Sequence, residues 1–172
     1  MNVLLVIDMQ TDFVDGVLGS AEAQAIVPYV VDRVKNFDGT VIFTRDTHGE
    51  DYLDTAEGKK LPVPHCIAGT EGWEVIPALR GISDGKVIDK PTFGSMVLAE
   101  ELKTIHGKTP IQSIILVGVC TDICVISNAM IVKVALPEVA MYVEAKGCAG
   151  VTPDSHENAL KAVEMCQITV VR

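Results

Sequence analysis

Short apolar runs alternate along the chain with segments of helical periodicity. Continuous runs of branched aliphatic residues predict buried strands. Such runs occur at residues 3–7, 40–44, 86–88, 111–119, 139–144 and 168–171. Apolar positions at helical spacing predict helices at residues 21–37, 96–105, 123–136 and 153–166. This alternation predicts an α/β fold: a doubly wound, mostly parallel six-stranded sheet with helices on both faces.

The polar residues that could take part in catalysis or ligand binding fall directly after predicted strands. They lie in residues 8–20, 45–73, 89–95 and 119–124. The carboxyl ends of parallel strands meet at one edge of a sheet, where ligands bind. We therefore expect these segments to build one site. Residues 46–73 form a long predicted loop, and such loops are often functional.

Composition and charge narrow the class of protein. The 172 residues are 48% hydrophobic and 22% charged, which suits one domain over residues 1–172. The net charge of −9 argues against a nucleic acid or an anionic membrane as partner. An odd number of cysteines without a C-x-x-C pair is typical of free thiols in a reducing cytoplasm. With no signal-peptide pattern at the start, we expect a cytoplasmic protein.

Cys124 has the context of a nucleophile. It lies where the strongest predicted strand leads into a predicted helix. The positive end of a helix dipole favours a thiolate, and the unpaired N–H groups there can stabilise an oxyanion. That combination suits acyl transfer. Two alternatives stay open on this evidence: a structural buried cysteine, and a redox pair with Cys120.

Two further charged residues follow predicted strands. Asp8 comes after the first apolar run, and Lys90 follows the run at 86–88. Taken singly, Asp8 is equally compatible with a helix cap, and Lys90 with a surface position. Their position at the expected edge makes both candidates for the site.

The loop after the second strand carries a possible metal site. Asp46 and His48 stand two residues apart, so their side chains project to the same side in extended backbone. His65 follows later, and Glu57 lies between. A carboxylate with two imidazoles suits Zn²⁺, Fe²⁺ or Mn²⁺. The alternative is a polar loop with two unrelated histidines.

In combination, these blocks resemble the isochorismatase-like cysteine hydrolases, and within them the nicotinamidase branch. The matching blocks are residues 6–13, 44–48, 64–72, 90–95 and 118–125. With the ending from residue 145 onward, the resemblance covers essentially the whole chain.

The resemblance implies roles for particular residues. Asp8, Lys90 and Cys124 would form the catalytic triad. A non-prolyl cis peptide would join Val119 to Cys120, with the N–H groups of Cys120 and Cys124 facing an oxyanion.

The nicotinamidase branch also implies a metal held by Asp46, His48 and His65. Glu57 fits a slot that some members fill with a fourth ligand, and Phe13 would pack on the substrate ring. The expected cofactor is a divalent metal, zinc first, with iron or manganese as alternatives.

The implied function is deamidation of nicotinamide to nicotinic acid and ammonia through a thioester on Cys124. The alternative on the same scaffold is a hydrolase of a different amide, carbamoyl or vinyl-ether substrate. Two features depart from the nicotinamidase pattern: residues 60–64 lack the usual aromatic before His65, and Thr47 is the middle residue of the Asp-x-His pair. The family also implies a homo-oligomer.

Two other classes of protein fit the sequence less well. A non-enzymatic interaction protein on this scaffold would not need the intact triad. A dinucleotide-binding enzyme is disfavoured because no G-x-G-x-x-G follows any predicted strand.

Overall fold

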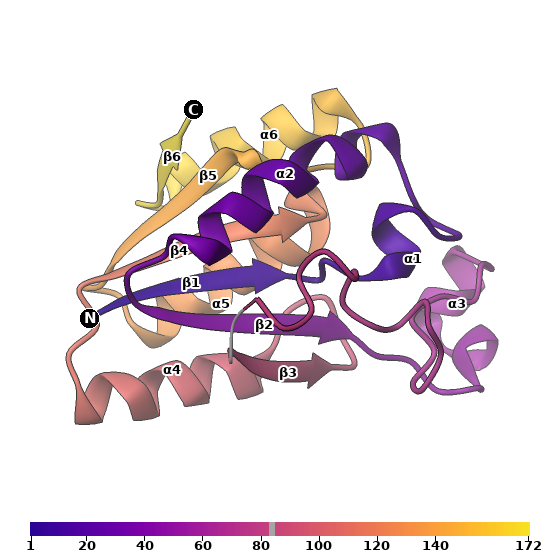
Figure 1. Cartoon of the computed structure of the whole chain (residues 1–172), viewed down its shortest axis with the longest axis horizontal. Coiled ribbons are helices and arrows are strands. Elements are labelled where there is room, and N and C mark those ends of the chain that lie inside the picture. Colours follow the sequence, from indigo (N-terminus) through magenta and orange to yellow (C-terminus); the bar gives the residue numbers. More distant parts are fainter. Residues whose placement is uncertain (83–84) are drawn as a thin grey trace.

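The computed structural model describes residues 1–82 and 85–172 and is built on a six-stranded parallel sheet (Figure 1). The strands are β1 (Asn2–Ile7), β2 (Thr40–Asp46), β3 (Lys86–Lys90), β4 (Ser113–Val119), β5 (Ala140–Ala149) and β6 (Thr169–Val171). Their order in the sheet is β3-β2-β1-β4-β5-β6, and each neighbouring pair is parallel. The predicted fold class is confirmed.

Helices cover both faces of this sheet. In Figure 1, α2 (Ala21–Lys35) lies in front of the sheet, and α5 (Ile126–Ala135) lies behind it. The face of α2 is completed by the segment around Leu79, and the other face by α4 (Met96–Lys108) and α6 (Pro153–Met165). Right-handed crossovers explain this division, because the chain moves one way from β1 to β2 and the opposite way from β3 to β6.

The central strand β1 fixes the position of Asp8, the first of the candidate catalytic residues. Residues 3–7 of β1 are fully buried, with β2 on one side and β4 on the other. A strand covered on both faces needs an unbroken aliphatic run. Burying one such side chain contributes roughly 1.5–3 kcal/mol. The core therefore fixes the point at which Asp8 leaves the sheet.

Several boundaries differ from the prediction. The third strand extends to Lys90, because Arg45 and Asp46 of β2 continue the pairing with β3. The predicted loop at 46–73 contains a 3₁₀ turn (Tyr52–Asp54) and the short helix α3 (Ala56–Lys60). A short helix, α1 (Thr11–Val14), also follows β1.

The predicted helix at 123–136 is wrong at its start. Residues Thr121–Val125 form a π-helical turn, and the α-helix begins at Ile126. The reason is a wide hydrogen bond, in which Val125 N–H donates to Cys120 O over five residues. Cys124 therefore lies inside a π turn that precedes the α-helix.

The carboxyl ends of the strands share one edge, near α1 and α3 in Figure 1. The chain reverses its winding direction between β1 and β4, which makes this edge a topological switch point. Within residues 1–82 and 85–172, no helix has the length and apolar character needed to cross a membrane. Met96 and Val134 are largely exposed on α4 and α5, and the expected homo-oligomer stays a prediction.

Candidate active site

The structure brings Asp8, Lys90 and Cys124 together at the switch point. Lys90 Nζ lies 2.7 Å from Asp8 Oδ2 and 3.5 Å from Cys124 Sγ. Asp8 and Lys90 are fully buried, and Cys124 is 4% exposed. The three side chains come from the ends of β1 and β3 and from the turn after β4.

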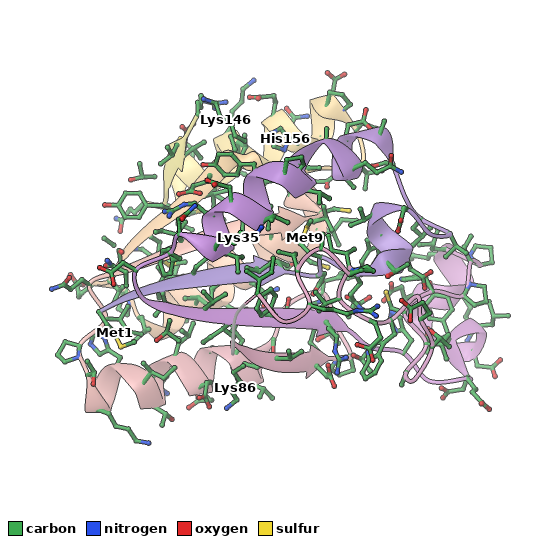
Figure 2. The ribbon with its side chains drawn as sticks, viewed as in Figure 1. Met1, Met9, Lys35, Lys86, Lys146 and His156 are labelled. Carbon is green, nitrogen blue, oxygen red and sulfur yellow. The ribbon has the colours of Figure 1, made fainter. Side chains whose placement is uncertain are left out.

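Lys90 differs sharply from the other lysines of the chain. Lys35, Lys86 and Lys146, labelled in Figure 2, are exposed. Lys90 Nζ is instead enclosed by Asp8, Cys124, Asp46 and the carbonyl of Thr92. A buried ammonium stays charged only when such partners surround it. The surface alternative for Lys90 is excluded.

Asp8 is held in an uncommon backbone conformation. Its φ of 48° lies in the left-handed region, which non-glycine residues rarely adopt. Thr44 Oγ1 donates to Asp8 Oδ1 at 2.6 Å and accepts from Asp8 N–H at 3.2 Å. The other oxygen, Oδ2, has no hydrogen-bond donor in suitable geometry among the described residues, although Lys90 Nζ lies close by.

Burial prevails in the pKa of Asp8 and Cys124, whereas neighbouring charges prevail in the pKa of Lys90. Burial raises the pKa of Asp8, although Lys90 lowers it. Burial and then Asp8 raise the pKa of Cys124 well above its usual range, and Lys90 only partly offsets them. For Lys90, burial disfavours the ammonium, but the surrounding negative groups outweigh burial and the pKa is raised. Within the π turn, burial therefore raises the pKa of the Cys124 thiol, against the effect expected of a helix N-terminus.

The approach to the nucleophile turn depends on one glycine. Gly118 has φ of 121°, and a Cβ there would overlap the carbonyl of Ile7 on the neighbouring strand. Only glycine allows β4 to lie so close to β1 at this point. Just after this glycine, the Val119–Cys120 peptide is cis, as expected from the resemblance.

The four predicted metal ligands converge beside the triad. One ligand atom from each of Asp46, His48, Glu57 and His65 lies within 4.8 Å of the others. Asp46 Oδ2 is 2.9 Å from His48 Nε2 and 3.8 Å from His65 Nε2. Glu57 Oε1 lies 3.7 and 3.6 Å from the same two nitrogens. Two carboxylates and two imidazoles gathered this tightly fit a divalent cation.

Surrounding groups orient these ligands. His65 Nδ1 lies 2.8 Å from Val63 O, which assigns its proton to Nδ1 and leaves Nε2 free to ligate. Tyr52 contacts both imidazoles, with ring centroids 4.7 Å from His48 and 5.0 Å from His65. The Tyr52 hydroxyl donates to Leu61 O at 2.9 Å. The sequence prediction missed Tyr52, whose only signal was its place in the long loop.

A cavity of about 480 Å³ opens onto both groups. Its lining residues are Phe13, Asp46, Ala56, Glu57, Lys60, Leu61, His65, Thr92, Phe93, Cys120, Ile123 and Cys124. The predicted Phe13 lines it, next to His65 with ring centroids 5.4 Å apart. Residues 60–64 supply the aliphatic Leu61, and the second aromatic is Phe93 from another loop. The sequence prediction missed Phe93, although it lies within residues 90–95, one of the blocks that match the family.

The chain matches a known family model over almost its whole length. The isochorismatase domain model covers residues 2–172. A curated relative, the nicotinamidase of Schizosaccharomyces pombe, is 28% identical over 98% of this chain and 91% of its own length.

Solved structures show the same architecture. The nicotinamidase/pyrazinamidase from Bacillus subtilis superposes with a TM-score of 0.85 at 26% identity, over 100% of both chains. An N-carbamoylsarcosine amidase from Thermoplasma acidophilum has a TM-score of 0.79 at 22% identity, over 100% of this chain and 96% of its own. At that identity the second likeness concerns the fold alone.

Proposed function

This chain is an amidohydrolase of the isochorismatase family, and from that premise we propose that it deamidates nicotinamide to nicotinic acid and ammonia. The observation that carries the proposal is that one cavity is lined both by Cys124 and by three of the four cluster residues, Asp46, Glu57 and His65. The curated nicotinamidase relative supports the choice of substrate.

We assign the acylation step to the triad. The Cys124 thiol gives its proton to Asp8 Oδ2, and the sulfur attacks the amide carbon. Lys90 stabilises the sulfur as it becomes negative, since its ammonium lies 3.5 Å away. The N–H groups of Cys120 and Cys124 stabilise the oxyanion, an interaction typically worth about 10²–10³ in rate for each donor. Asp8 then gives the proton to the nitrogen, the C–N bond breaks, and ammonia leaves.

The second half returns the enzyme to its starting state. Water adds to the thioester carbon as Asp8 takes one of its protons. The C–S bond then breaks, nicotinic acid leaves, and the Cys124 sulfur recovers the proton from Asp8. The raised pKa of Asp8 suits this alternation between base and acid.

The remaining residues bind and orient the substrate. Asp46, His48, Glu57 and His65 would hold a divalent metal, with zinc favoured by the donor set, and when bound it would supply a Lewis acid beside Cys124. Phe13 and Phe93 supply aromatic walls for a flat ring.

Ammonia release from a matched set of amides tests the substrate. Nicotinamide, benzamide and an N-carbamoyl amino acid are compared with metal-supplemented protein. Benzamide has the same ring shape without the ring nitrogen. We expect the highest kcat/KM for nicotinamide. Faster release from the carbamoyl compound would contradict the proposal in favour of the alternative on the same scaffold.

A further inference from the structure

Asn128 is a fully buried polar residue on α5, four residues after Cys124. Its Nδ2 donates to Cys124 O at 2.8 Å and to Phe93 O at 3.0 Å. Its Oδ1 accepts from Ser95 N–H at 3.0 Å. Exchanging the amide oxygen and nitrogen would place an oxygen against two carbonyls, so this network admits one orientation.

The three hydrogen bonds join two parts of the active site. One bond holds the π turn that carries Cys124. The other two hold the loop between β3 and α4, in which Phe93 lines the cavity. In the same loop, Thr92 O accepts a hydrogen bond from Lys90 Nζ at 3.2 Å. The side-chain amide of Asn128 thereby fixes Cys124 relative to Phe93 in the cavity wall. It also fixes Cys124 relative to the loop whose Thr92 carbonyl accepts a hydrogen bond from Lys90.

We propose that Asn128 is a positioning residue, which sets the placement of Cys124 for attack and of Phe93 for gripping the substrate ring. The kinetic part of this inference rests on the proposed function. The placement of Cys124 does not, because it governs thiol reactivity in the absence of substrate. A buried amide with both donors and its acceptor engaged in this way specifies one local arrangement.

Two substitutions separate the two connections. Asn128→Asp keeps the acceptor for Ser95 N–H but faces the carbonyls of Cys124 and Phe93 with an oxygen. Asn128→Thr can still donate to Cys124 O, the carbonyl four residues earlier. It loses the hydrogen bonds to Phe93 and Ser95 in the loop between β3 and α4. Arg33→Met is the matched control. Arg33 donates to the buried Glu144 of β5, and neither residue lines the cavity.

The expected results differ between the variants. Asn128→Asp lowers kcat for nicotinamide by about 10²-fold, the scale of a misplaced reacting group, and raises KM. Asn128→Thr raises KM with a much smaller change in kcat. Arg33→Met lowers the melting temperature and leaves both constants at wild-type values.

Iodoacetamide labelling without substrate gives the deciding readout. The label on Cys124 is located by fragmenting the peptide that also holds Cys120, and exposed Cys166 is the internal reference. We expect Asn128→Asp to slow Cys124 labelling at least tenfold relative to Cys166. An unchanged or faster rate overturns the proposal, as does a variant that loses stability but keeps wild-type kcat and KM. If nicotinamide is not a substrate of the wild-type protein, the labelling rate alone decides.

Discussion

The triad and the metal cluster lie side by side but are built in different ways. Asp8 and Lys90 are fully buried at the ends of core strands. In the metal cluster only Asp46 belongs to a strand, and the side chain of Glu57 is 21% exposed. The sheet thus fixes Asp8 and Lys90, and Cys124 follows in the π turn directly after β4. The cluster instead depends on a long loop and on the packing of Tyr52 against both imidazoles.

Asp46 is the link between the two regions. Its Oδ1 lies 3.2 Å from Lys90 Nζ, and its Oδ2 lies 2.9 Å from His48 Nε2. Burial works against ionisation of Asp46, but His48 and Lys90 outweigh burial and lower its pKa. Asp46 therefore stays a carboxylate that serves both regions. Variants that disable one region and spare the other test how separable they are.

Removing the nucleophile should have the largest effect. Cys124→Ala should lower kcat for ammonia release by about 10⁴-fold or more, because the sulfur assigned to the thioester is removed. Metal content, measured by elemental analysis, should equal that of the wild type, because Cys124 is not among the cluster residues. Retention of most activity would show that the nucleophile is assigned wrongly.

Removing a cluster ligand should have a smaller effect on rate and a larger one on metal. His48→Ala should lose most of the bound metal. Its kcat/KM should fall by about 10²–10³-fold, which corresponds to the several kcal/mol of transition-state stabilisation that a Lewis acid can supply. Labelling of Cys124 by iodoacetamide should persist, because the sheet still places the triad. His106→Ala, on α4 outside the cluster, is the matched control. Undiminished metal in His48→Ala would contradict the ligand assignment.

The same contrast explains how far the sequence could be interpreted. The strand runs predicted the six-stranded sheet, and the edge rule predicted that residues 8, 90 and 124 meet there. These inferences succeed because a buried parallel strand needs a continuous apolar run, which is visible in the sequence. The cis peptide was implied by the family resemblance alone. For the cluster, the two-residue spacing of Asp46 and His48 already indicated a possible metal site, and the resemblance supported the ligand set.

What the sequence did not predict depends on contacts between distant segments. Phe93 lines the cavity, and Asn128 is bonded across the site, through tertiary packing that has no local pattern. The pKa of Cys124 depends on packing in the same way. A helix dipole can be inferred from the sequence, but the burial that raises the pKa of Cys124 cannot.

The smallest effect should come from the support beneath the metal cluster. Tyr52→Phe keeps the ring against His48 and His65 but removes the hydroxyl that donates to Leu61 O. A single such hydrogen bond contributes about 1 kcal/mol. Metal affinity, measured by competition with a chromophoric chelator, should fall by less than about tenfold.

At saturating metal, the kcat of Tyr52→Phe should match that of the wild type, because the triad takes its geometry from the strands. Tyr52→Leu also removes the ring and should weaken metal binding further, again without lowering kcat once the site is filled. A reduced kcat at saturating metal would mean that the loop also positions the triad. The link through Asp46 would then transmit the geometry of the loop to Lys90, and the two regions would have to be treated as one catalytic unit.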